Sequence, residues 1–179
     1  MAYFGRLKKY KSVDHLLYAF KSIRQKMNEA ELLIIGEGDD RQRLEQLVRR
    51  LEIQDAVRFT GFVSEAEKVA LLQQAWFLVN TSSKEGWGLT VIESNACGTP
   101  VIAGNVPGLR DSIKDHETGL LYEYGNIAEL EKKMFLLLND YDLRKRLTVE
   151  AHKWSLTFDW SVSAEKMIML LQQKISSIH

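Results

Sequence analysis

The chain has 179 residues, 45% of them hydrophobic and 27% charged, as is usual for a globular protein with one full-sized core. Lys plus Arg and Asp plus Glu balance at 24 each, so the net charge gives no reason to expect binding to nucleic acid or an anionic membrane. No apolar run approaches the roughly 18 residues of a membrane-spanning helix, and nothing resembles a secretion signal. The lone cysteine, Cys97, excludes an intrachain disulfide. A cytoplasmic location is therefore expected.

Short strand-like runs alternate with amphipathic helical patterns, which is typical of parallel βαβ units. The strands are expected at Tyr3–Gly5, Glu31–Ile35, Val57–Thr60, Trp76–Asn80, Pro100–Gly104 and Gly119–Tyr122. The helices between them are expected at about Ser12–Lys26, from an Asp39 cap to Leu51, from a Ser64–Glu67 capping box onward, and from Leu89 to about Gly98. These elements predict a doubly wound, Rossmann-like parallel sheet.

After residue 125 the chain contains neither Gly nor Pro and is expected to be helical, at roughly Ile127–Leu138, Leu143–Lys153 and Ser161–Lys174. We therefore expect one α/β domain over residues 1–179 with a helical C-terminal tail from about residue 161. Because a buried strand opens the chain, a preceding domain is expected to be missing. In such folds ligands bind beyond the carboxyl ends of the strands.

The most informative motif is Glu85-Gly-Trp-Gly-Leu-Thr-Val-Ile-Glu93. Gly86 and Gly88 leave the backbone uncovered, and the helix that follows, expected to pack inward from Leu89, offers free amides and its dipole to an anion. The two carboxylates can hold hydroxyl groups. An anion carried by a polyhydroxyl compound suggests a nucleotide sugar.

Two further loops follow predicted strands. In the basic loop Gly5–Lys11, Arg6 is suited to binding two phosphate oxygens and Lys11 supplies a point charge, while Lys8 and Lys9 are expected to be solvated. Gly36-Glu-Gly38 resembles half of a dinucleotide fingerprint, but Arg41 occupies the third glycine position. A tight turn that a nucleotide approaches closely is the better interpretation.

Several residues suggest structural roles. The four histidines lack metal-ligand spacing and the adjacent Asp39 and Asp40 lack a third ligand, so no metal site is expected. Cys97 is expected to pack rather than react. Trp154 and Trp160 are expected to anchor the tail. For Trp87 a sugar-lining role and a core role both stay open.

Six motifs occur in the order found in one known family: Gly5-Arg6 with Lys11, Gly36-x-Gly38, Phe59-x-Gly61-Phe62, Glu85-x7-Glu93, Ala96–Val101 and Glu117–Leu121. In these motifs the chain resembles the group 1 glycosyltransferases, which are family 4 retaining enzymes of GT-B fold. The resemblance covers essentially the whole chain and corresponds to the C-terminal, donor-binding domain. It implies transfer of a sugar from a nucleotide-diphosphate sugar, without a metal or other cofactor.

The resemblance also implies a role for each matched residue. Arg6 and Lys11 neutralise the donor diphosphate, Glu85 with the amides of Gly86 and Trp87 holds the donor sugar, and Glu93 holds the ribose. The amides of Gly88 and Leu89 bind the distal phosphate. The base lies near Gly36, Gly38, Phe62 and Val63. The chain departs from the family at Ser12 and Pro107, where glycine is common, and at Thr81, where proline is common.

The resemblance places the acceptor site in a missing N-terminal domain. The acceptor, a sugar or a lipid-linked glycan, and any contact with a membrane would come through that domain, and the isolated chain is expected to transfer little. Two alternatives stay open: a stand-alone nucleotide-sugar-binding module without transfer activity, and a GT-B epimerase acting on a UDP sugar. The Glu85-x7-Glu93 motif argues against the epimerase.

Overall fold

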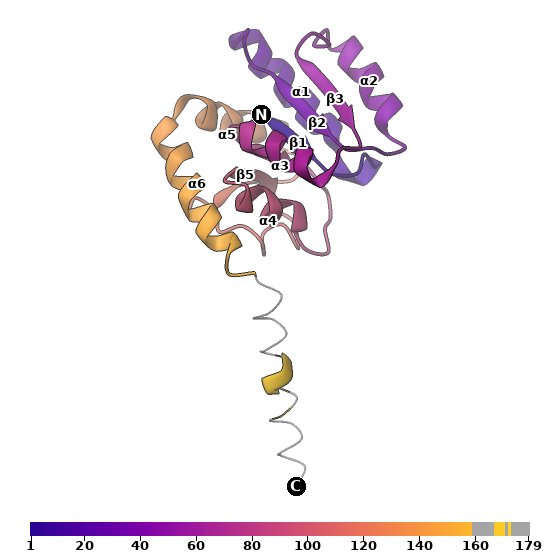
Figure 1. The fold of residues 1–179 in the computed structure, drawn as a ribbon. Coiled ribbons are helices and arrows are strands. Elements are labelled where there is room, and N and C mark those ends of the chain that lie inside the picture. The colour runs from indigo at the N-terminus through magenta and orange to yellow at the C-terminus, as the bar shows by residue number, and fades with distance from the viewer. Residues whose placement is uncertain (159–166, 171, 173–179) are drawn as a thin grey trace.

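The computed structural model describes residues 1–158, 167–170 and 172. Within them, six parallel strands form one sheet in the order β3-β2-β1-β4-β5-β6 (Figure 1). The strands are β1 (Ala2–Phe4), β2 (Leu32–Ile35), β3 (Val57–Gly61), β4 (Leu78–Asn80), β5 (Val101–Gly104) and β6 (Gly119–Tyr122). This order confirms the predicted doubly wound sheet. The direction of winding reverses between β1 and β4, which makes the crevice beyond their carboxyl ends the expected ligand site.

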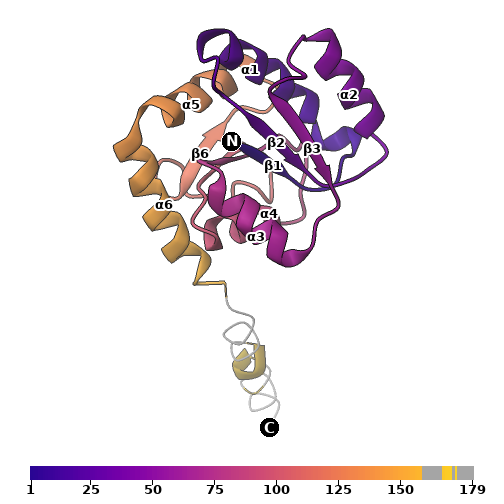
Figure 2. The ribbon, with the colours of Figure 1, turned by 45° about the horizontal axis from the view of Figure 1, so that its top comes forward.

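Helices cover both faces of the sheet, with α1, α2 and α5 on one face and α3 and α4 on the other (Figure 2). The helices are α1 (Val13–Lys26), α2 (Arg41–Arg50), α3 (Glu65–Gln74), α4 (Leu89–Ala96), α5 (Ile127–Asn139) and α6 (Tyr141–Ser155), with a short 3-10 turn η1 (Lys9–Lys11) after β1. Successive strand residues point to opposite faces, so Tyr3 packs with the α1 and α5 side while Ala2 packs with the α3 and α4 side.

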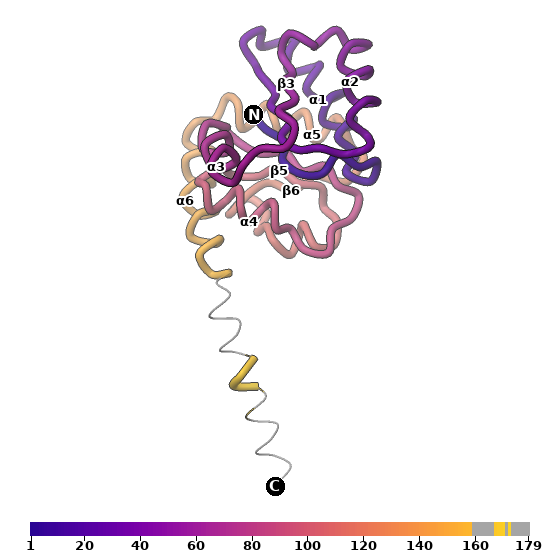
Figure 3. Tube along the Cα trace, turned by 45° about the vertical axis from the view of Figure 1, so that its right-hand side comes forward, coloured from indigo at the N-terminus to yellow at the C-terminus, as the bar shows by residue number. Residues whose placement is uncertain are grey.

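Helix α6 runs beside α4 at the end of the described domain (Figure 3). The indole Nε1 of Trp154 donates to the Ser112 carbonyl at 3.0 Å, and the Trp154 ring packs edge-on against Phe158. Trp154 therefore anchors α6 on the domain. Trp160 and most of the expected helix Ser161–Lys174 lie outside the described residues.

The structure corrects three local predictions. Trp76 is exposed and precedes β4, which begins only at Leu78, so the predicted strand was too long at its start. Leu89 is 54% exposed rather than packed inward, because α4 turns Val91 toward the core instead. The residue that precedes α2 is Asp40, not Asp39, and its carboxylate binds Arg43 at 2.6 and 2.7 Å rather than capping the helix. Asp39 is paired with Lys8.

Candidate functional site

The loops that leave β1 and β4 meet at the point where the sheet reverses direction. Lys11 and Glu85 lie 74 residues apart in sequence, and their Nζ and Oε1 atoms form an ion pair of 2.5 Å. Only 9% of the Lys11 side chain and 15% of the Glu85 side chain are exposed. The two loops are joined as well, since the Thr81 hydroxyl donates to the Lys11 backbone carbonyl at 2.8 Å. The structure therefore brings together the two residues that the sequence placed in separate motifs.

Glu85 receives a second hydrogen bond on the same oxygen. The hydroxyl of Ser82, which is fully buried, donates to Oε1 at 2.7 Å. Among the described residues, none contacts Oε2 through a hydrogen bond or an ion pair. Sequence reasoning missed Ser82, although its position three residues before Glu85 is a signal that the two side chains share a turn.

Arg6 lies at the same edge of the sheet, exposed and without an ion pair to any residue in the described part of the chain. Its backbone is held by Tyr3, whose hydroxyl donates to the Arg6 carbonyl at 3.0 Å. Burial raises the pKa of Tyr3, and the negative charge of Glu85 adds to the rise. Tyr3 therefore stays a neutral donor that orients the loop while the Arg6 guanidinium remains free for an anion.

Ser12 occupies the N-cap of α1 in the left-handed conformation, with a φ of 49°. Glycine adopts this conformation at little cost, which explains why a glycine suits the position. In this chain the Ser12 hydroxyl shares a hydrogen bond of 2.9 Å with the Tyr124 hydroxyl. That contact offsets part of the backbone cost and allows serine there.

The four glycines that the sequence singled out serve different purposes. A Cβ on Gly36 would lie 2.1 Å from the Gly5 carbonyl oxygen, and one on Gly38 would lie 2.0 Å from that of Leu7, so packing of the loops requires both. A Cβ on Gly88 would lie 2.2 Å from the Ser112 hydroxyl. A Cβ on Gly86 would meet nothing within 4 Å. The fold therefore leaves Gly86 as an open stretch of backbone beside Glu85.

The amides at the start of α4 are only partly available. The Gly88 amide donates to the Gly108 carbonyl at 3.1 Å, and the Leu89 amide donates to the Trp87 carbonyl at 2.9 Å. The amides of Gly86, Trp87 and Thr90 have no acceptor among the described residues. Both amides expected to bind the distal phosphate are thus already paired in this structure.

Gly108 shapes this loop from the other side. It follows Pro107, has a φ of 82°, and a Cβ on it would lie 2.4 Å from the Glu85 carbonyl oxygen. The Pro107-Gly108 departure therefore lies directly against the motif. Trp87 is half-buried and packs edge-on against Phe158, with ring centroids 4.9 Å apart, so it has a packing role here.

Glu93 lies one turn into α4 with 44% of its side chain exposed, and one of its oxygens is 3.6 Å from the Lys68 ammonium. Burial lowers the pKa of Lys68, but its contacts with Glu65 and Glu93 leave that pKa above the ordinary value. Lys68 therefore stays charged beside Glu93. Sequence reasoning missed Lys68; the signal is its place one helical turn before the buried Leu72, on the inward face of α3.

The turns after β2 and β3 lie together beside β1. The Gly36 amide donates to the Gly61 carbonyl at 3.0 Å, which joins the turn holding Gly36 and Gly38 to the one holding Phe62 and Val63. Phe62 is 88% exposed and Val63 is half-buried. An exposed aromatic ring at this edge offers a stacking surface.

Other residues remain apart from this region. Cys97 packs at the end of α4, where burial raises the pKa of its thiol and so favours the unreactive protonated form. Among the described residues, no three His, Cys, Asp or Glu side chains gather as a metal site would require. Within the same residues, no helix is both long and apolar enough to cross a membrane.

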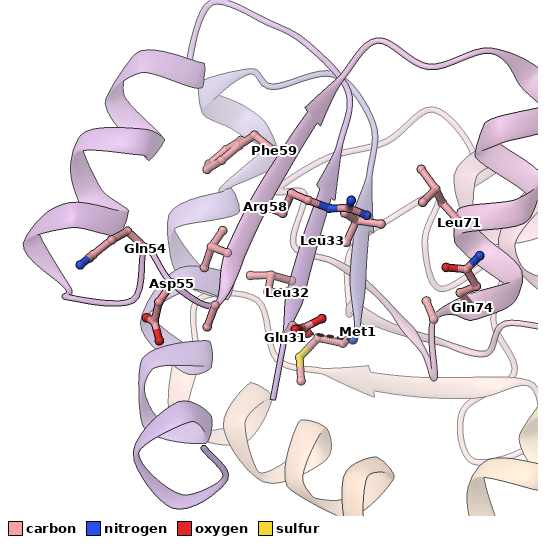
Figure 4. A pocket seen from close by; sticks show the side chains of 13 residues that line it. Met1, Glu31, Leu32, Leu33, Gln54, Asp55, Arg58, Phe59, Leu71 and Gln74 are labelled. Atoms are coloured by element: carbon pink, nitrogen blue, oxygen red, sulfur yellow. Dashed lines mark hydrogen bonds between the residues drawn. The ribbon is translucent and has the colours of Figure 1, made fainter. Parts of the chain in front are cut away.

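A cavity of about 730 Å³ does not coincide with this region (Figure 4). It lies over the face of β2 and β3 at the amino ends of the strands, lined by residues such as Met1, Glu31, Leu33, Asp55, Phe59 and Gln74. Lys11 and Glu85 lie at the carboxyl ends instead. Neither Lys11 nor Glu85 therefore lines this cavity.

Known proteins resemble this chain over most of its length. The relative "Alpha-monoglucosyldiacylglycerol synthase" of Streptococcus pneumoniae is 37% identical over 121 residues, which are 68% of this chain and 27% of that protein. The solved structure of TarM from S. aureus, crystallised with UDP, has a TM-score of 0.87 at 25% identity and covers 94% of this chain and 34% of its own. The C-terminal domain of a group 1 family glycosyl transferase from Francisella tularensis has a TM-score of 0.79 at 26% identity, covering 88% and 84%.

The chain spans between 27% and 44% of the length of the first relatives it matches. The family model described as "Glycosyl transferases group 1" matches residues 1–154. With the all-parallel, doubly wound sheet and the site at its switch point, this match shows that the chain belongs to the group 1 glycosyltransferases.

Proposed function

We propose that this chain is the donor-binding half of a retaining glycosyltransferase that uses a nucleotide-diphosphate sugar. The observation that carries the proposal is the buried Lys11–Glu85 ion pair at the β1–β4 switch point, with the unpaired Arg6 beside it. Arg6 and Lys11, suited to a diphosphate, and Glu85, suited to sugar hydroxyls, thus follow neighbouring strands at one edge of the sheet. The UDP in the TarM structure supports a nucleotide as part of the ligand.

The proposed chemistry depends on charge that develops as the glycosidic bond breaks. Negative charge grows on the departing diphosphate, and fixed cations near it lower the barrier. Arg6 binds phosphate oxygens through its planar guanidinium, while Lys11 supplies a point charge. The acceptor oxygen then bonds to the anomeric carbon on the face that the phosphate leaves, and the departing phosphate takes the proton of the acceptor hydroxyl, which gives retention.

Glu85 and Glu93 hold the donor rather than cleave it. Glu85 accepts hydrogen bonds from the sugar hydroxyls beside the open backbone of Gly86 and the free Trp87 amide. Glu93 accepts them from the ribose, with Lys68 balancing its charge. A retaining hydrolase instead needs a nucleophile and an acid about 5–5.5 Å apart across the bond, and neither residue is spare for that use.

The phosphate contacts at α4 differ from those that the family resemblance implied. Because the Gly88 and Leu89 amides already have acceptors, the free amide of Thr90 is the better donor at the helix start. The helix dipole favours an anion there whichever amide binds it. The base would stack at the edge formed by Gly36, Gly38, Phe62 and Val63.

The acceptor would be bound by a second domain. The product named for the Streptococcus pneumoniae relative, a monoglucosyldiacylglycerol, is a glycolipid, which makes a lipid-linked acceptor one candidate beside a sugar. Without such a domain only half of the cleft exists. The 179-residue chain should therefore bind donor weakly and transfer little.

Isothermal titration calorimetry of the chain with UDP, GDP and ADP, and with the glucose ester of each, tests the proposal. We expect saturable binding of the nucleotide and the glucose ester that carry one of the three bases. The Glu85→Ala variant should bind that glucose ester more weakly than the wild-type chain does. Absence of saturation with all six ligands, in a sample whose circular dichroism shows a folded α/β domain, would overturn the proposal.

A further inference from the structure

We propose that Ser82 is a positioning residue, which orients the Glu85 carboxylate so that Oε2 faces the donor sugar. This inference rests on the proposed function. It concerns a fully buried serine that the family motif around Glu85 and Glu93 does not include.

The hydrogen bonds to Glu85 are asymmetric. Lys11 at 2.5 Å and Ser82 at 2.7 Å both contact Oε1, whereas Oε2 has no partner among the described residues. A quarter turn of the carboxylate about its Cγ–Cδ bond would weaken both contacts at once, whereas a half turn only exchanges two equivalent oxygens. Oε2 is therefore the oxygen left to accept hydrogen bonds from a ligand.

Ser82 is itself held by the end of the sheet. The Asn80 side chain, almost fully buried where β4 ends, accepts from the Ser82 amide at 3.1 Å and donates to the Thr90 hydroxyl at 3.2 Å. Asn80 thus joins the strand end, the loop and the first turn of α4. This links the position of the Ser82 hydroxyl to the rigid sheet.

The two donors to Glu85 are not equivalent. An ammonium group is a point charge on a flexible stem, so it attracts the carboxylate without fixing its orientation. When Lys11 turns toward a diphosphate, its contact with Glu85 weakens. The Ser82 hydroxyl, short and buried, then remains as the directional contact that keeps Oε1 inward.

The test compares Ser82→Ala with two matched serine variants of the chain by calorimetry. The ligands are the nucleotide and its glucose ester that bind best among the UDP, GDP and ADP pairs. Since Ser82→Ala loses the hydrogen bond that orients the charged carboxylate, we expect it to bind the glucose ester at least about tenfold more weakly. Affinity for the nucleotide alone should stay within about twofold, because it makes no contact with Glu85.

The controls separate orientation of Glu85 from loss of any hydroxyl. Ser94→Ala removes an equally buried hydroxyl, which donates to the Thr99 carbonyl at 2.9 Å. Ser83→Ala changes the adjacent residue and removes a hydroxyl that donates to the Tyr10 carbonyl at 3.0 Å. The backbone amide of residue 83 still donates to the same carbonyl at 2.9 Å. Neither control should alter the ratio of the two affinities.

The inference would be overturned if the ratio of the glucose-ester affinity to the nucleotide affinity were the same in Ser82→Ala and Ser94→Ala. It would also be overturned if Ser82→Ala lost affinity equally for both ligands. If Ser82→Ala does not fold, Ser82→Cys, similar in volume but a poor donor, must show the same selective loss. Glu85→Ala separates the two proposals. An unchanged glucose-ester affinity in that variant refutes the proposed function, whereas a loss there but not in Ser82→Ala refutes only the role of Ser82.

Discussion

Lys11 and Glu85 place opposite charges where most of the surrounding water is excluded. Such a pair adds little net stability compared with apolar residues, since desolvation of both groups opposes their attraction. Removal of one partner is costly, because the other charge then stays buried and unpaired. The proposed ligand binding gives a reason for such a pair at the switch point, since folding alone gains little from it.

Removal of Lys11 alone should destabilise the fold, because Glu85 then stays buried without its partner. Lys11→Ala should lower the free energy of unfolding by about 3 kcal/mol, the low end for a broken buried pair, because both side chains keep some exposure. Lys9→Ala, a change at an exposed neighbour, should stay within about 0.5 kcal/mol of the wild type. Urea unfolding measures both. A Lys11→Ala/Glu85→Ala variant should lose less than the sum of the single changes, and strict additivity would contradict the pairing.

Gly38 and Gly86 give a matched pair of glycine variants. Gly38→Ala should destabilise the fold by about 2 kcal/mol, because its Cβ would lie 2.0 Å from the Leu7 carbonyl oxygen. Gly86→Ala should keep wild-type stability, since nothing lies within 4 Å, yet weaken binding of the nucleotide sugar. Thermal unfolding and calorimetry measure the two effects. Normal ligand affinity in Gly86→Ala would mean that no ligand approaches this backbone.

At the scale of elements, α3 shows how far local chemistry decides structure. The capping box predicted at Ser64–Glu67 is confirmed, with the Glu67 amide donating to the Ser64 hydroxyl at 3.3 Å and the Ser64 amide donating to the Glu67 carboxylate at 2.9 Å. Both partners lie three residues apart, so the motif needs no distant contact. The Asp39 cap predicted for α2 was wrong, because Asp39 pairs with Lys8 and α2 begins only after Asp40.

Ser64→Ala should therefore cost about 1 kcal/mol of stability at neutral pH. Its hydroxyl and amide hold the pKa of Glu67 below the ordinary value, so this stabilisation is present above the unfolded-state value of about 4.3 and is lost as the pH falls through the folded-state value. The difference between Ser64→Ala and the wild type should shrink in acid. Urea unfolding across that range measures it, with Ser22→Ala in the middle of α1 as control; a constant difference would exclude Glu67 from the cap.

At the scale of the whole molecule, the strand order gathers the loops that carry the candidate ligands. Arg6 and Lys11 follow β1, and Glu85 follows the neighbouring β4, so parallel strands deliver them to one edge (Figure 1). The turns after β2 and β3 extend that edge on the β1 side. Under the proposed function, this one edge of the sheet would contact sugar, diphosphate and base together.

In an enzyme that joins this chain to an acceptor-binding domain, Glu85→Ala and Lys11→Ala should each lower turnover at least ~100-fold, as expected for loss of a group that stabilises developing charge. Steady-state assays with the donor identified by calorimetry measure this. Wild-type turnover in both variants would remove the assigned mechanism. Product analysis by NMR in the same assay distinguishes transfer from epimerisation.

Binding of the donor should not depend on a divalent metal. Arg6, Lys11 and the free amides supply the positive charge that a metal would otherwise bring to the diphosphate. Calorimetric affinities measured with EDTA and with Mg²⁺ should therefore agree within about twofold. A large gain with Mg²⁺ would show that these groups do not suffice.

The sequence by itself determined the succession of strands and helices along the chain, the α3 cap and the types of residue at the site. Periodicity, capping and loop glycines depend on neighbours within a few residues, which is why they can be predicted from the sequence. The tertiary structure alone decided that Lys11 pairs with Glu85, that Ser82 and Lys68 contact the two glutamates, and that Gly108 occupies the Gly88 amide. Each of these contacts joins side chains or amides at 2.5–3.6 Å whose positions depend on how whole loops pack. Local patterns in a single sequence do not encode such distances.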